Sequence, residues 1–104
     1  MYKVAIVGEN DTVAGFRALG LEVFPASESE HAKQILETLI RQDFAVIYIT
    51  EQIASGIMDY INKLKTGILP AVILIPGNKG SMGIAMAEIK KAVEKAVGAD
   101  ILGD

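Results

Sequence analysis

A short apolar run at residues 4–7 constrains the fold most, because a glycine and a polar turn follow it at once. The run Val-Ala-Ile-Val carries no polar side chain on either face, which is typical of a parallel strand covered by helices on both sides. Gly8 ends the run, and Asn10, Asp11 and Thr12 can each place a side-chain oxygen on the open amides of a first helical turn. The sequence therefore predicts a central strand that passes directly into a helix near Asp11.

Strand-like and helix-like segments alternate along the rest of residues 1–76. Further short apolar strands are expected at residues 21–24, 44–49 and 71–75. Amphipathic helices are expected between them, at about residues 11–19, 30–41 and 51–64. Alternating strands and helices of this length imply right-handed crossovers. We expect a small flavodoxin-like or receiver-like α/β domain, with a four-stranded parallel sheet and helices on both faces.

Local signals predict how these helices begin, end and face the core. Gly20 stands where the first helix would need a left-handed residue to end. Ser27 or Ser29 is a candidate cap for the second helix. The predicted apolar stripe of the second helix comprises His31, Ile35, Leu36, Leu39 and Ile40, and that of the third helix comprises Ile53, Ile57, Tyr60, Ile61 and Leu64.

The segment after Pro76 differs in kind from the body. Residues 77–83, GNKGSMG, contain Gly77, Gly80 and Gly83 and match neither a P-loop nor a dinucleotide-binding spacing, so we interpret them as a hinge. A last helix and tail are expected over residues 84–104. Apolar residues at spacings of three and four form a seam along that helix: Met82, Met86, Ile89, Val93 and Ala96. The seam fits a partner helix, and it fits equally an ordinary amphipathic helix on its own sheet.

Charge and composition exclude several classes of function. The chain has a net charge of −3 and no cysteine, which argues against nucleic-acid binding, disulfides and thiolate chemistry. Residues 1–76 hold 6 basic and 9 acidic side chains, whereas residues 77–99 hold 4 basic and 2 acidic ones, so a basic arm follows an acidic body. The longest apolar stretch, residues 68–76, is too short to span a membrane. We expect no membrane insertion and no export signal.

The loops after the strands carry no complete catalytic set. A receiver-type phosphate site needs an acidic pair after the first strand, an Asp after the third strand and a nearby Lys. Glu9 and Asp11 supply the first requirement, but Thr50 and Glu51 stand where the Asp is needed. The single histidine, His31, has too few convergent ligands for a metal. We expect no catalytic residue, no cofactor and no metal site.

The turn after the first strand carries a recognisable signature. Its residues are Gly8, Asp11, Thr12, Val13, Gly15, Phe16, Arg17 and Gly20. This pattern resembles the amino-terminal signature of the F subunits of V-type and A-type rotary ATPases. The resemblance continues through residues 45–54 and 71–77 and ends on VGADIL at residues 97–102.

The resemblance implies a non-catalytic rotor component of the central stalk. Such a protein binds the coiled-coil D subunit of the shaft, and its last helix reaches toward the catalytic A and B ring, where ATP turnover is coupled to proton or sodium transport. It would be cytoplasmic and peripheral to the membrane. Two alternatives remain from the residues: a receiver-like signalling or small-ligand-binding domain with a site around Glu9, Asp11 and Thr50, and an oligomer in which the seam pairs with itself.

Overall fold

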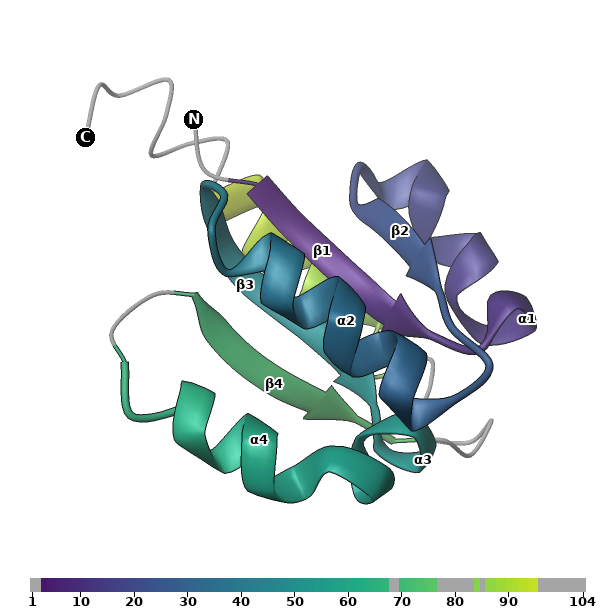
Figure 1. Ribbon diagram of the computed structural model, residues 1–104. Helices are drawn as coiled ribbons and strands as arrows, with labels where there is room; N and C mark the ends of the chain where they lie inside the picture. Colours follow the sequence, from purple (N-terminus) through teal and green to yellow (C-terminus); the bar gives the residue numbers. More distant parts are fainter. Residues whose placement is uncertain (1–2, 68–69, 77–83, 85, 96–104) are drawn as a thin grey trace.

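Strands and helices alternate along the chain as the sequence predicts (Figure 1). The computed structural model describes residues 3–67, 70–76, 84 and 86–95. The elements are β1 (Lys3–Gly8), α1 (Asn10–Val13), η1 (Ala14–Leu19), β2 (Glu22–Pro25), α2 (Ser29–Leu39), β3 (Phe44–Thr50), α3 (Glu51–Ala54), η2 (Ser55–Ile57), α4 (Met58–Leu64) and β4 (Ala71–Ile75), where η marks a 3₁₀ helix. Residues 84 and 86–95 are also helical, and we refer to residues 86–95 as the terminal helix.

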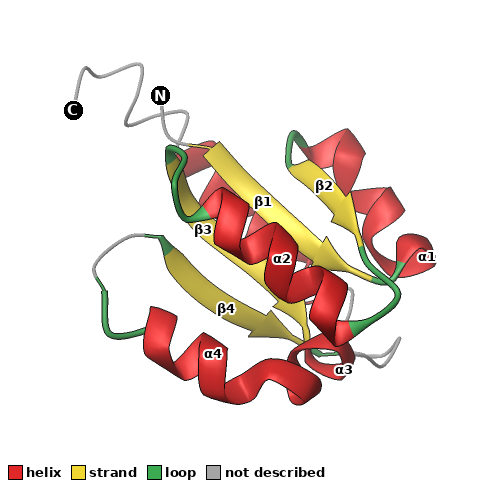
Figure 2. Cartoon of the chain, in the orientation of Figure 1, coloured by secondary structure: helices red, strands yellow, loops and turns green. Residues whose placement is uncertain are grey.

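The four strands form one parallel sheet in the order β2-β1-β3-β4. Their arrowheads all point the same way in Figure 2. The register pairs Ile6 of β1 with Val23 of β2 and with Tyr48 of β3, and Tyr48 in turn with Ile73 of β4. This topology confirms the predicted α/β class. It also brings the carboxyl ends of β1 and β3, at Gly8 and Thr50, side by side at one edge of the sheet.

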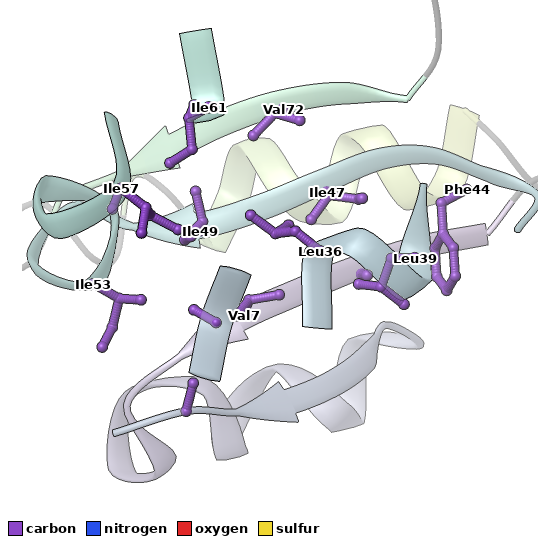
Figure 3. Close-up of a cluster of buried hydrophobic side chains, with 14 residues drawn as sticks. Val7, Leu36, Leu39, Phe44, Ile47, Ile49, Ile53, Ile57, Ile61 and Val72 are labelled. Atoms are coloured by element: carbon purple, nitrogen blue, oxygen red, sulfur yellow. The ribbon is translucent and has the colours of Figure 1, made fainter. Parts of the chain in front are cut away.

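The central strand β1 is buried on both faces, as its apolar run predicts. Ala5 and Val7 join a first core between the sheet and the helices α2, α3 and α4 (Figure 3). That first core consists of Ala5, Val7, Ala26, Ala32, Leu36, Leu39, Phe44, Ile47, Ile49, Ile53, Ala54, Ile57, Ile61 and Val72. Val4 and Ile6 point to the opposite face of the sheet, because side chains alternate along a strand.

A second core fills that opposite face. Its buried members are Val4, Ile6, Val13, Phe16, Leu21, Tyr48, Ile75 and Ile89. The covering side chains come from α1, from η1 and from the terminal helix, which lies behind the sheet as seen in Figure 1, on the face opposite α2. Helices thus cover both faces, as expected for a doubly wound sheet.

The first helix differs from the prediction at its start and in its form. Glu9 occupies the N-cap position of α1, but its side chain makes no hydrogen bond to the first turn of the helix. The amides of Thr12 and Val13 instead donate to the Glu9 carbonyl, at 3.0 and 2.9 Å. The helix then tightens into the 3₁₀ turns of η1. The predicted left-handed end is confirmed, since Gly20 has φ of 91°.

The expectation that Ser27 or Ser29 caps the second helix is wrong. Glu28 precedes α2 without a side-chain cap, and the Ser29 hydroxyl donates to the carbonyl oxygen of Ile53 at 2.7 Å. In an unbroken α-helix that carbonyl accepts only from the amide of Ile57. The third helix is divided at this point into α3, η2 and α4. The hydrogen bond from Ser29 to Ile53 therefore lies at the break between α3 and α4, which helical periodicity alone does not predict.

The buried stripe of α2 is also narrower than predicted. Ala32, Leu36 and Leu39 are buried, whereas Ile35 and Ile40 are half-buried. His31 is exposed, so its place in the apolar stripe is wrong. The small side chain of Ala32 lies fully inside because α2 sits close to the sheet.

Candidate functional site

The carboxyl ends of β1 and β3 meet where open parallel sheets hold their ligands. Thr50 is fully buried there, and its hydroxyl donates to Oε1 of Glu9 at 3.0 Å. Gly8 lies directly against Thr50: a Cβ at Gly8 would be only 2.8 Å from Thr50 Oγ1 and 3.1 Å from Cγ1 of Val13. At this edge, therefore, Gly8 packs tightly against Thr50, and the Thr50 hydroxyl is hydrogen-bonded to one carboxylate oxygen of Glu9.

The predicted trio of Glu9, Asp11 and Thr50 is only partly brought together. Glu9 and Thr50 are hydrogen-bonded, but Asp11 lies exposed on α1. In the part of the chain that the structure describes, no group of three or more His, Cys, Asp or Glu side chains could hold a metal ion. The geometry at this edge supports a structural lock between β1 and β3.

The signature residues divide into a buried and an exposed set. Val13 and Phe16 are buried in the second core, where they hold α1 and η1 on the sheet. Gly15 and Arg17 are exposed on η1, and Thr12 is half-buried. A Cβ at Gly15 would meet nothing within 4 Å, so close packing on the sheet does not require a glycine at this position. The exposed pair therefore takes no part in holding η1 on the sheet.

The terminal helix lies with its seam against its own sheet. Ile89 is 1% exposed in the second core, while Met86, Ala92 and Val93 are half-buried beside it. Val93 reaches the turn at Gly20, where a Cβ would lie 3.7 Å from Val93 Cγ1. The other side of the helix carries the exposed residues Glu88, Lys90, Lys91, Glu94 and Lys95. The remaining seam and hinge residues, Met82, Ala96, Gly77, Gly80 and Gly83, fall outside the described residues.

Tyr48 connects the sheet to this helix electrostatically. Burial in the second core raises the pKa of Tyr48, and the nearby carboxylate of Glu88 raises that pKa further. Glu88 belongs to the terminal helix, so part of the rise in the Tyr48 pKa comes from that helix. Sequence reasoning missed Tyr48. The sequence does place a tyrosine within an apolar strand, and strand alternation puts Tyr48 on the same face as Val46 and Thr50. That pattern could have indicated a buried phenol.

The described elements define a small α/β protein in which a Glu9–Thr50 hydrogen bond joins the carboxyl ends of β1 and β3 and the terminal helix covers one face of the sheet. No helix among the described residues is long and apolar enough to cross a membrane. Residues 4–93 match the family described as the ATP synthase (F/14-kDa) subunit, and the chain belongs to this family.

Individual relatives agree with that assignment over nearly the whole chain. The F subunit of a V-type ATP synthase from Clostridium botulinum strain Eklund 17B is 46% identical over 100 residues, covering 96% of this chain and 97% of the relative. The corresponding F subunit of Clostridium perfringens strain 13 is 45% identical, with 98% of each chain covered. The F subunit of an A-type ATP synthase from Methanothermobacter thermautotrophicus is 28% identical, with 95% of each chain covered. The similarity therefore spans both V-type and A-type relatives.

Proposed function

We propose that this chain is the non-catalytic F subunit of a V/A-type rotary ATPase or ATP synthase, a rotor component of its central stalk. The observation that carries the proposal is the family match over residues 4–93, together with relatives named as F subunits that align from end to end. The hydrogen bond between Glu9 and Thr50 supports a structural role for these two residues at the carboxyl end of the sheet. The protein acts on ATP turnover and on proton or sodium transport only through its partners. It works on the cytoplasmic side, peripheral to the membrane.

The partner in this proposal is the coiled-coil D subunit, which forms the shaft. A rigid α/β body with two cores supplies a stable docking unit. The seam of Met86, Ile89 and Val93 has the spacing that packs against helices. In the described conformation the chain's own sheet occupies that seam, so binding through it requires the helix to leave the sheet.

The terminal helix would then act as a switch between a docked and an extended position. The three glycines of residues 77–83 provide the hinge, and the extended helix reaches along the shaft toward the catalytic A and B ring. A ligand shifts such an equilibrium only as far as it favours one state over the other. In this proposal the shaft binds the extended state more tightly than the docked state. The position of the helix then tunes the coupling between ATP turnover and rotation.

Distance measurements on the full chain with and without the D subunit test both parts of the proposal. The chain has no cysteine, so spin labels can be attached at Lys63→Cys on α4 and Lys91→Cys on the terminal helix, both exposed sites. Light scattering on the same samples reports whether the complex forms. We expect a stable complex and a longer label distance within it.

The control pair places both labels on the body, at Lys63→Cys and Gln34→Cys, which are also exposed. Its distance should stay constant, because α2 and α4 share one core. Failure of the two proteins to associate contradicts the stalk assignment. A complex with an unchanged distance between positions 63 and 91 keeps the assignment and contradicts the switch.

A further inference from the structure

The sheet face under the terminal helix is strongly apolar. Ile6 is fully buried there, and Val4, Tyr48 and Ile75 are 6%, 6% and 3% exposed. We refer to these four residues as the docking face. They come from three adjacent strands, and the register places Ile6 beside Tyr48, so they form one continuous surface. When the terminal helix leaves, this surface keeps only the cover that Val13 of α1 and Phe16 of η1 give it.

A bare docking face would be unfavourable in water. Contiguous apolar surface is expensive to hydrate, and large exposed patches of this kind are found where another molecule binds. Nearby β4 already exposes Ile73, at 43%, on the same side of the sheet. Release of the helix enlarges this patch toward the middle of the sheet. An extended state therefore becomes accessible when something else covers the docking face.

The present occupant shows what shape of partner fits. The docking face accepts an α-helix whose Ile89 is fully inserted, flanked by Met86 and by Val93 at spacings of three and four. The opposite side of that helix carries exposed charged residues, so the helix is amphipathic. An amphipathic helix with one large aliphatic residue at its centre reproduces this fit.

We propose that the docking face is a shared helix-binding site, occupied either by the chain's own terminal helix or by an amphipathic helix of the shaft partner, and never by both. The inference rests on the proposed function, since the shaft supplies the second helix. Each helix competes with the other for the same residues, so partner binding and helix release are one linked event. The terminal helix is then a built-in competitor that weakens unproductive association.

Photo-crosslinking from the floor of the docking face tests this directly. Tyr48 is replaced by p-benzoylphenylalanine in the full chain, which is irradiated alone and with the shaft protein. The matched control carries the same replacement at Tyr60, another tyrosine, which packs against the first core on the opposite face of the sheet. We expect an intramolecular product at position 48 in the free chain and a cross-link to the shaft in the complex. Position 60 should give no shaft cross-link.

The outcomes separate this proposal from the one it rests on. A complex that forms by light scattering but gives only intramolecular product at position 48 overturns the shared site and leaves the stalk function standing. Absence of any complex overturns both. A cross-linked pair of these chains assigns the face to a second copy and also overturns the proposal.

A second attachment site guards against misfolding of the first variant. Val46 is half-buried on the same face, next to Tyr48 in β3. Val46→Cys can carry a benzophenone maleimide, since the chain has no cysteine of its own. The same cross-link to the shaft is expected from this site, and its absence in a formed complex counts against the shared site as well.

Discussion

The hydroxyl of Thr50 donates a 3.0 Å hydrogen bond to Oε1 of Glu9, across 41 positions of sequence. It joins the carboxyl ends of β1 and β3, the place where open parallel sheets hold their ligands. In this chain the fully buried Thr50 uses its donor within the protein, and the carboxylate of Glu9 is engaged as its acceptor. This hydrogen bond ties β1 to β3. The proposed partner site lies instead on the sheet face that the terminal helix covers.

Gly8→Ala should destabilise the fold. An added Cβ would press against Thr50, with Oγ1 only 2.8 Å away in the fully buried core. Overpacking of this kind costs about 1–3 kcal/mol of the free energy of unfolding. Urea denaturation followed by circular dichroism measures the loss.

The matched control is Gly15→Ala in the same signature. Its Cβ would meet nothing within 4 Å, and its φ is not positive, so a gain of about 0.4–1 kcal/mol is expected from a less flexible unfolded chain. Removing the obstructing atoms with Thr50→Ala should make the double variant with Gly8→Ala lose less than the sum of the single losses. Strict additivity would show that the two residues do not touch.

Gly56→Ala should destabilise through a different contact. A Cβ at Gly56 would lie 2.6 Å from Cβ of Ser29, at the break between α3 and α4. We expect a loss of about 1–3 kcal/mol from this clash. Ser29→Ala alone should cost about 1 kcal/mol, because it removes the hydrogen bond to the Ile53 carbonyl.

The identity of the substitution at Ser29 decides whether the clash is relieved. Ser29→Ala removes Oγ, the atom nearest to the added Cβ, but keeps its own Cβ at 2.6 Å, so it should rescue Gly56→Ala less than Ser29→Gly, which removes both atoms. Thermal melting of the two double variants makes the comparison. Equal rescue by both substitutions would point to the hydroxyl alone and contradict a clash with the Cβ of Ser29.

The stability of the chain should fall in the alkaline range because of Tyr48. Burial, and then the carboxylate of Glu88, raise the pKa of Tyr48 above its ordinary value of 10.0. The folded state therefore holds the phenolic proton more tightly than the unfolded state does. Its contribution is complete below about pH 10 and is lost as the pH rises through the folded pKa. Denaturation at a series of alkaline pH values should show a shallower decline for Tyr48→Phe.

Glu88→Gln tests the second cause of the raised pKa. Removing that negative charge should lower the pKa of Tyr48 toward 10.0 without changing burial. An ultraviolet titration of tyrosinate absorbance, with Tyr48→Phe as the reference that identifies the signal, measures the shift. An unchanged titration in Glu88→Gln would mean that the terminal helix does not hold Glu88 near Tyr48.

The fold was largely predictable, because its strands are short apolar runs separated by amphipathic helices. The run at residues 4–7 and the glycine at position 20 depend on local patterns, and both predictions are confirmed. The helix starts were not predictable in the same way. Glu9 and Ser29 direct their side chains to partners 41 and 24 positions away, which no local capping rule can anticipate.

The candidate site was only half predictable, for a physical reason. The spacing of Met86, Ile89 and Val93 specifies a helix with one apolar face, but that face suits a sheet as well as another helix. Only the three-dimensional structure shows that these residues now lie on Tyr48 and its neighbours. Tyr48 could not be singled out from the sequence for the same reason, because the sequence does not show that the terminal helix packs over it.

Ile89→Ala should release the terminal helix while leaving the body folded. Ile89 is 1% exposed at the centre of the helix contact, and truncation of a buried isoleucine costs about 2–5 kcal/mol. The first core does not include Ile89, so the loss is limited to the docking of the helix. Hydrogen exchange should become faster in residues 86–95 and on the docking face, and stay slow in α2. The control is Ile84→Ala, which alters a side chain that is 67% exposed and should change exchange nowhere. Faster exchange throughout α2 in Ile89→Ala would show that helix and body unfold as one unit, and would argue against a helix able to leave the sheet on its own.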